Sequence, residues 1–490
     1  MLFNTIEFVV FFVVVLAIIT IIKNRKFQHL FLLFTSFFFL YYTDNYLVIL
    51  LLFTILLHFY TGREIYKSNT RERKKIFFII GIAGSLGLLG FFKYADFAIA
   101  QFNIFGNIVD LGSEIPLMDL ALPIGISFYT FQSLSYIIDI YRGNLTPAKT
   151  LKEYAIFVAF FPVLVAGPIL RARQFLPQLR EKMEKFNSTG GLRQLVIQNS
   201  NLKLGITIMA FGFFKKVFIA DNLTPLTGHE VPVPELESFI VIIRTIALGI
   251  QVYCDFSGYS DIAIGAALIF GFKIPRNFNK PFFATSPSDF WSRWHISLTK
   301  WVIDYLYFPL VFKNRKSSVV VYSSLMITML LLGLWHGASW NFIIFGGLHG
   351  IFLATHTIIK RKFPHISSHP FFQKRIGKFS SIIITQYIIF LLWIPFFIPE
   401  PNLMLVNMQK FVFLDFLTEN SIPFIISQKY PIAIMGFFVL LHLISYRAKN
   451  LPMRISKLKS PYWILFLFVA LFFILFFYNG NPEPFIYFKF

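Results

Sequence analysis

Repeated apolar segments, each long enough to cross a lipid bilayer, are the strongest constraint on how this chain can fold. A helix of about 20 apolar residues spans the hydrocarbon core, and such segments recur along most of the 490 residues. Only 14% of the residues are charged, whereas a typical soluble domain carries about 25%. Inside lipid the backbone polar groups must be satisfied within the protein, as they are in a helix. The sequence therefore predicts an all-α polytopic membrane protein.

The apolar segments predict about 11 or 12 transmembrane helices. Another apolar run, 153–170, begins and ends beside basic residues and predicts a re-entrant segment, which is tolerated where protein or a water cavity covers it. No internal repeat or Gly/Ser-rich linker interrupts the pattern, so we expect one membrane domain over 1–490. The candidate spans are 5–22, 29–42, 46–60, 76–93, 120–141, 203–219, 239–256, 319–335, 342–359, 379–398, 430–447 and 461–478.

Lys and Arg residues are concentrated between particular spans, which accounts for the net charge of +21 without a nucleic-acid partner. Cytoplasmic loops of membrane proteins collect Lys and Arg. Placing the basic clusters inside gives one consistent path, with the N-terminus outside. The clusters are Lys23–Lys26, Arg63–Lys75, Arg171–Lys203, Lys313–Lys316, Lys360–Lys378 and Arg447–Lys459.

Two histidines lie within the apolar stretch "LLGLWHGASWNFIIFGGLHG", residues 331–350. We expect His336 near the bend of a helical hairpin, where Gly333 and Gly337 leave space for a ligand or another helix. Ionisable groups inside a membrane usually face a cavity, and a neutral imidazole beside an alcohol can act as a general base. A hydrogen bond between helices is an equally good reading of His336. For His349 simple packing is the better one.

The stretch "SDFWSRWHISLTKWVIDYLYFPL", residues 288–310, predicts an amphipathic helix at the cytoplasmic boundary over 289–306. Ser288 is the expected N-cap, with Asp289 in the first turn. His295 falls next to an apolar stripe rather than on the charged side. The stripe comprises Trp291, Trp294, Leu298, Trp301 and Tyr305, and the other side carries Arg293, Ser297, Lys300 and Asp304.

The segment "QVYCDFSGYSD", residues 251–261, holds the single cysteine of the chain. One cysteine excludes an intrachain disulfide and a cysteine metal cluster, and Cys254 is expected to be a small buried side chain. Asp255 and Asp261 could order a re-entrant turn or bind a partner group. The sequence lacks a G-x-S-x-G elbow, a Walker A loop and an H-E-x-x-H zinc motif.

These motifs together resemble the membrane-bound O-acyltransferase family (MBOAT), and most closely its bacterial alginate O-acetyltransferase branch. The similarity covers about residues 120–350 and includes "DFWSRWHISLTKWVIDYLYFPL" followed by "LWHGASWNFIIFGGLHG". Ile303 departs from the arginine that is common in the branch. Three further matches are "LPIGISFYTFQSLSYIIDIYRG" (122–143), "FFPVLVAGPILRARQFLPQL" (160–179) and "GFFKKVFIADNL" (212–223); a fourth runs from "QVYCDFSGYSD" on to residue 282.

The resemblance implies a ring of helices around a thin centre, crossed by a tunnel, with re-entrant and amphipathic helices on the cytoplasmic side. It places the catalytic histidine of "WHG" at His336. The second functional histidine, in "RWH", falls on His295, where eukaryotic relatives often carry Asn or Asp. Expected substrate-binding residues are Trp291, Arg293, Trp294, Lys300, Trp335, Trp340, Asp255 and His349.

The implied reaction is transfer of an acyl group from a cytoplasmic thioester to a hydroxyl group outside. Acetyl-coenzyme A suits the basic cytoplasmic face as a donor substrate, and neither a bound cofactor nor a metal is expected. The implied acceptor is a polysaccharide, with an SGNH-like extracytoplasmic acetyltransferase as partner, in the bacterial inner (plasma) membrane. Two alternatives stay open: a D-alanyl transfer protein of teichoic acid modification, served by a carrier protein, and a polysaccharide or lipid transporter.

The charge pattern yields a testable topology. Loops 94–115 and 220–238 should face outside and loops 63–75 and 447–460 the cytoplasm, because Lys and Arg are confined to the second pair. Cysteines introduced into each loop should react with an impermeant thiol reagent in intact cells only in the first pair. Labelling of 447–460 in intact cells would contradict this topology.

Overall fold

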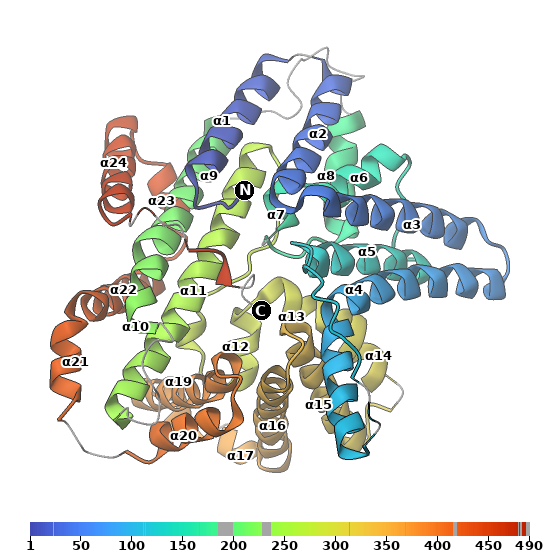
Figure 1. Cartoon of the computed structure of the whole chain (residues 1–490). Helices are drawn as coiled ribbons and strands as arrows, with labels where there is room; N and C mark the ends of the chain where they lie inside the picture. The colour runs from blue at the N-terminus through green and yellow to red at the C-terminus, as the bar shows by residue number, and fades with distance from the viewer. Residues whose placement is uncertain are drawn as a thin grey trace. The chain divides into compact units, whose positions relative to one another are not determined.

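Every regular element in the described part of the chain is a helix, and no strand occurs there (Figure 1). This confirms the all-α prediction. The computed structural model describes the chain except for residues 23, 111, 113, 166, 185–198, 228–236, 313, 368, 415–418, 479, 481–482 and 487–490.

The chain divides into two compact units, which are described separately. The first comprises Met1–Ala210 and Tyr259–Pro275, and the second Phe211–Gly258 and Arg276–Phe490. The expected single domain stays a prediction. Helices in the N-terminal part of the chain are α1 (Ile6–Ile21), α2 (Arg25–Asp44), η1 (Asn45–Leu47), α3 (Val48–Lys67), α4 (Arg71–Ile108), α5 (Ile126–Tyr141), α6 (Leu151–Ala159), α7 (Phe161–Leu164), α8 (Ala172–Glu184) and α9 (Asn199–Phe213).

The rest of the chain carries the remaining helices, several of them short. They are η3 (Phe214–Ala220), η4 (Asp221–Leu223), α10 (Thr224–Thr227), α11 (Ser238–Ile269), η6 (Pro281–Phe283), α12 (Pro287–Arg293), α13 (Ile296–Val302), η7 (Ile303–Tyr307), α14 (Phe308–Val311), α15 (Ser318–His336), α16 (Trp340–Lys362), α17 (Pro364–Ser367), α18 (Pro370–Gln373), α19 (Arg375–Phe397), α20 (Pro401–Val412), α21 (Ser421–Ser427), α22 (Lys429–Arg447), α23 (Leu451–Ser456) and α24 (Ser460–Phe476).

Seven helices among the described residues are long and apolar enough to cross a membrane. They are Phe27–Lys67 (α2 and α3 taken together), α4, α11, α15, α16, α19 and α22, and two shorter apolar helices, α1 and α24, add to them. The chain is therefore a multi-pass membrane protein. The remaining predicted spans, 120–141 and 203–219, correspond to the shorter α5 and to α9 continued by the π-helical segment η3.

Two expectations about loops were wrong. The loop predicted at 94–115 is helical as far as Ile108, because α4 continues without a break. The turn considered near Asp255 and Asp261 does not exist, since α11 runs continuously through both residues. The other predicted outside loop, 220–238, falls partly on residues 228–236, which lie outside the described residues.

The predicted re-entrant run forms two short helices, α6 and α7, in the first unit. Their side chains are almost all buried by protein, as irregular backbone at membrane depth requires. The start of α6 is tied down by Glu153, which is 2% exposed and pairs with Arg180 at 2.5 Å. These contacts suit a re-entrant segment, whose membrane position stays a prediction.

The predicted hairpin in the second unit is confirmed, with His336 as the last residue of α15 and α16 returning beside it (Figure 1). Of the two expected occupants of the space beside the glycines, a ligand or another helix, the structure places the partner helix there. A Cβ at Gly333 would lie 2.2 Å from the Phe342 carbonyl oxygen, and one at Gly346 would lie 2.3 Å from that of Met329. A Cβ at Gly337 would lie 2.1 Å from the Phe342 ring. Glycine thus allows backbone-to-backbone packing of the two helices.

We predict that Gly333→Ala destabilises the protein by about 1–3 kcal/mol, the typical range for overpacking. The matched control is Gly436→Ala in α22, where a Cβ meets no atom within 4 Å. Alanine there should be neutral or slightly stabilising, because it is the better helix former. Unfolding of the purified variants in detergent measures both changes. Equal stability of the two variants would contradict the close packing of α15 and α16.

Candidate functional site

A break in the predicted amphipathic helix forms one edge of the site. The structure has α12 and α13 in place of one helix over 289–306, and the two meet at Trp294 and His295. The N-cap is Ser286 rather than Ser288: its hydroxyl accepts the Asp289 N–H at 3.2 Å, and Pro287 follows in the first turn. Asp289 lies in that turn as predicted.

Asn277, in the loop after α11, holds the start of α13. The backbone carbonyl oxygen of Asn277 accepts a hydrogen bond from the Ile296 N–H at 2.8 Å. The side-chain oxygen of Asn277 accepts one from the Ser297 hydroxyl at 2.6 Å. Ser297 is buried. The expectation that it lies on the charged side of an amphipathic helix was therefore wrong. His295 takes a left-handed backbone conformation, with φ of 42°, which is uncommon for a residue other than glycine. These bonds fix the direction of its side chain.

His295 lies outside the spanning helices and is almost completely buried, with 1% of its surface exposed. Its ring packs edge-on against Phe256 at 4.6 Å between centroids. Neither ring nitrogen has a hydrogen-bond partner among the described residues. Burial lowers the pKa of His295 to about 3, because desolvation disfavours the charged ring. His295 is therefore neutral at physiological pH.

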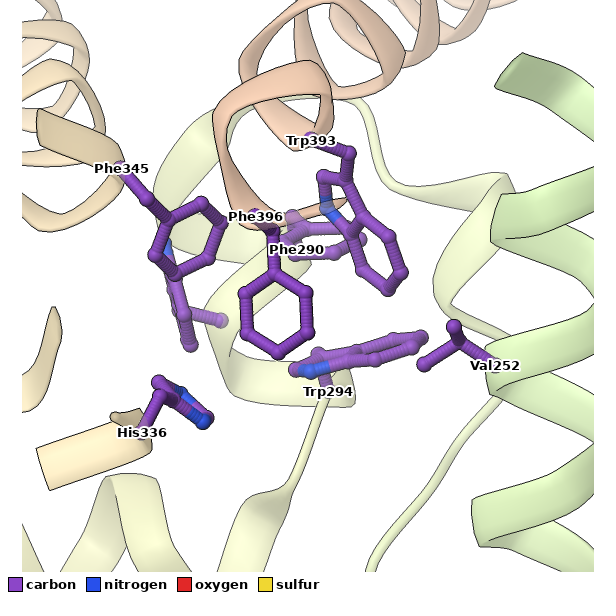
Figure 2. Close-up of a pocket in the computed structure, with 8 residues that line it drawn as sticks. Val252, Phe290, Trp294, His336, Phe345, Trp393 and Phe396 are labelled. Carbon is purple, nitrogen blue, oxygen red and sulfur yellow. The ribbon is translucent and has the colours of Figure 1, made fainter. Parts of the chain in front are cut away.

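His336 opens into a small aromatic pocket in the second unit (Figure 2). Its ring lies 5.2 Å from Phe396 and 5.9 Å from Phe345, and the opposite wall contains Trp294 and Trp393, whose rings are 4.8 Å apart. The pocket draws its lining from α11, α12, the residue after α12, α15, α16 and α19. The lining residues are Val252, Phe290, Trp291, Trp294, His336, Phe345, Trp393 and Phe396.

The other predicted histidines flank the same aromatic cluster. The ring of Trp335 lies 4.9 Å from His336 and 6.3 Å from His295, so one indole contacts both. His349 lies behind the pocket wall, 5.3 Å from Trp291 and 4.6 Å from Phe345. His349 is fully buried, and neither of its ring nitrogens has a hydrogen-bond partner among the described residues. The fold therefore gathers three histidines that are separated in the sequence.

Other predicted site residues lie outside the pocket lining. Arg293 pairs with Asp289 at 2.7 Å. Lys300 is exposed, and Trp340 is 56% exposed near the tip of the α15–α16 hairpin. Binding of the acyl donor by Arg293 and Lys300 therefore stays a prediction.

Asp255 is engaged in buried structural contacts. One carboxylate oxygen lies 2.8 Å from the Lys216 ammonium, and the other accepts the Ile486 backbone N–H at 2.7 Å. Lys216 also contacts Asp221 at 2.7 Å, and all three side chains of this ionic group are buried. Asp255 therefore does not line the pocket but fixes a residue near the C-terminus to α11.

The sequence reasoning missed five of the lining residues: Val252, Phe290, Phe345, Trp393 and Phe396. The last two lie on α19, beyond the region of motif similarity. Near the end of α19, Pro395 removes a backbone N–H donor, and the Asn341 side chain donates to its carbonyl oxygen at 3.0 Å. This bond ties the start of α16 to the end of α19, where both aromatic residues lie. A tryptophan two residues before a proline in an apolar span was a sequence signal for this part of the site. No set of three His, Cys, Asp or Glu side chains within the described ranges forms a metal site.

Comparisons with known proteins identify the family to which this chain belongs. The membrane-bound O-acyltransferase family model matches residues 148–397, which include every residue of the pocket lining. A probable alginate O-acetylase, AlgI, of Azotobacter vinelandii is 40% identical over 304 residues, which are 61% of this chain and 57% of that protein. The aligned part thus spans less than two thirds of that relative's length.

Two other relatives carry different activities in their names. A peptidoglycan O-acetyltransferase of Helicobacter pylori is 33% identical over 399 residues, 76% of this chain and 72% of that protein. A teichoic acid D-alanyltransferase of Streptococcus thermophilus is 30% identical over 252 residues, 49% of this chain and 58% of that protein. The family model and the long alignment to the H. pylori protein lead to one conclusion: the chain belongs to the membrane-bound O-acyltransferase family.

Proposed function

We propose that this protein is a membrane O-acetyltransferase that moves an acetyl group from a cytoplasmic thioester, such as acetyl-coenzyme A, to hydroxyl groups of a polysaccharide outside a bacterial cell membrane. The observation that carries the proposal is the position of His336 in an aromatic pocket, inside the region matched by the O-acyltransferase family. Four of the helices that line the pocket, α11, α15, α16 and α19, are long and apolar enough to cross the membrane. A pocket between such helices suits transfer of an acyl group from a donor on one side of the membrane to an acceptor on the other.

In this proposal His336 is the general base. Its neutral ring takes the proton of the acceptor hydroxyl as the oxygen attacks the thioester carbonyl carbon. The carbon–sulfur bond then breaks, and the leaving thiolate takes the proton from the imidazolium ring. The aromatic walls help by excluding water, which would otherwise hydrolyse the thioester. Trp335, which contacts both rings, would position His336 and His295 relative to each other.

The pocket favours acetyl over D-alanyl as the transferred group. A D-alanyl group carries an ammonium, and burying it without a partner is costly. The pocket lining carries no carboxylate, and its walls suit a methyl group instead. The O-acetylating relatives of A. vinelandii and H. pylori are also more similar to this chain than the D-alanyltransferase is. The D-alanyl reaction stays the second candidate, because aromatic rings can also bind an ammonium.

The acceptor is proposed from what the relatives share. The names of the two relatives refer to alginate and to peptidoglycan, and both polymers are glycans with sugar hydroxyls. A partner of the SGNH type outside the membrane would receive the acetyl group or direct it to the glycan.

Comparison of the ester-linked acetyl and D-alanyl contents of surface glycans, with and without the gene, separates the acetyl reaction from the D-alanyl reaction. An unchanged content of both esters favours a transporter.

We predict that His336→Ala reduces acyl transfer by about 100- to 10,000-fold, the range for loss of general acid–base catalysis. Base-labile acetyl on surface glycans, measured by mass spectrometry, should fall below detection. Membrane abundance and a monodisperse detergent profile serve as controls for folding. Near-normal acetylation by a well-folded His336→Ala protein would refute the role of His336.

His295 and His349 should respond differently from His336. His295→Ala should impair transfer. His295→Asn should retain part of it, because a neutral amide, which eukaryotic relatives often carry at this position, can offer a bound substrate one hydrogen bond in place of a ring that is already neutral. With a pKa of about 3, His295 does not titrate between about pH 5 and 8. The acid limb of the pH–rate profile should therefore be the same in His295→Asn as in the wild type. A shifted acid limb in His295→Asn would contradict a neutral His295. Of the three alanine substitutions, His349→Ala should reduce acyl transfer least.

A further inference from the structure

One side chain of the pocket carries a hydrogen-bond donor that the fold leaves unused. Trp393 on α19 is 6% exposed, and its indole nitrogen is buried with no hydrogen-bond partner among the described residues. Leaving a buried donor without a partner destabilises the folded state, because the group loses its hydrogen bonds to water and gains none in return. A phenylalanine would fill much of the same space without that cost. The unsatisfied N–H therefore indicates a bonding partner that enters the pocket.

The position of Trp393 suits a partner held near His336. Its ring packs edge-on against Trp294 at 4.8 Å and lies 6.2 Å from Phe396, which in turn contacts His336 at 5.2 Å. Figure 2 shows the Trp393 nitrogen on the edge of the indole that faces away from Val252, toward the side of the pocket that holds Phe396 and His336. A group in the pocket would thus have a base on one side and a donor on another.

We propose that the indole N–H of Trp393 is the oxyanion donor of the acyl transfer reaction. The inference rests on the proposed function, since it assigns a second catalytic residue to that site. Trp291 also has a buried nitrogen without a partner among the described residues, but its ring packs edge-on against His349 at 5.3 Å, behind the pocket wall. Trp294 also lines the pocket, and its indole N–H is the rival donor that the substitutions below separate from that of Trp393. The Val and Phe side chains of the lining carry no donor.

The step forms one carbon–oxygen bond and breaks one carbon–sulfur bond. The acceptor oxygen forms a bond to the thioester carbonyl carbon while its proton passes to His336. The carbonyl π electrons move onto the oxygen, and the Trp393 N–H stabilises this oxyanion. The carbonyl re-forms as the carbon–sulfur bond breaks, and the thiolate leaves with the proton from His336. A donor in a dry, apolar pocket acts more strongly than one in water, because water does not screen it.

The decisive substitution removes only the N–H. Trp393→Phe is the first variant, and β-(3-benzothienyl)alanine at position 393 is the second, because sulfur replaces the N–H in a ring of nearly the same shape. Trp463→Phe in α24, outside the pocket lining, is the matched control. Vesicles containing each full-length protein, together with the cell's own acceptor glycan, are supplied with radiolabelled acetyl-coenzyme A. Labelled glycan gives kcat and KM.

Removing one oxyanion donor typically lowers kcat by about 100- to 1,000-fold. We expect this loss in both position-393 variants, with KM for acetyl-coenzyme A changed less than about twofold, because the bond strengthens mainly in the transition state. Trp463→Phe should match the wild type. The benzothienyl variant keeps the test valid if phenylalanine disturbs folding.

Three results would overturn the inference. Normal kcat in the benzothienyl variant would show that the N–H is not used. A raised KM with normal kcat would make Trp393 a binding residue only. The same loss in Trp294→Phe with a normal position-393 variant would assign the donor to Trp294. If the wild type transfers no acetyl group at all, the proposed function itself fails, whereas an active wild type with active variants refutes only the role of Trp393.

Discussion

Backbone contact between α15 and α16 is the packing constraint on which the rest of the site depends. Gly333 and Gly346 lie so close to the opposite backbone that neither can carry a side chain without movement. This contact sets the tip of the hairpin and with it the position of His336. In a membrane, where lipid competes for apolar surface, such close packing is a main source of helix association. A side chain at either glycine would move the candidate base as well as the helix.

The second half of the site depends on a break rather than on a helix. Asn277 satisfies the backbone and side chain at the start of α13. Those bonds hold His295 in a left-handed conformation between two short helices, and Phe256 covers its ring. An uninterrupted amphipathic helix would have kept the regular stripe that the spacing suggested. The break instead turns Trp294 into the pocket and buries His295 beside Trp335.

Aromatic side chains connect these two halves and give the pocket its chemical character. Trp335 contacts both His295 and His336, and α19 closes the pocket with Trp393 and Phe396. A wall of this kind excludes water and offers few polar groups. Each polar atom that remains therefore matters more than it would in a wet site. The base at His336 and the unpartnered indole N–H of Trp393 are the two such groups on which the proposed chemistry depends.

The sequence by itself determined the membrane class, most of the long helices and the hairpin that carries His336, because apolar length and glycine placement act locally along the chain. Its motifs also pointed to His336 and His295. Only the tertiary structure decided that Asp255 belongs to a buried ionic group with Lys216, that the predicted helix over 289–306 is broken, and that Trp393 lines the pocket. These outcomes depend on contacts between residues far apart in the sequence, such as that between Asn341 and Pro395. Periodicity within one segment carries no information about which distant segment will supply its partner.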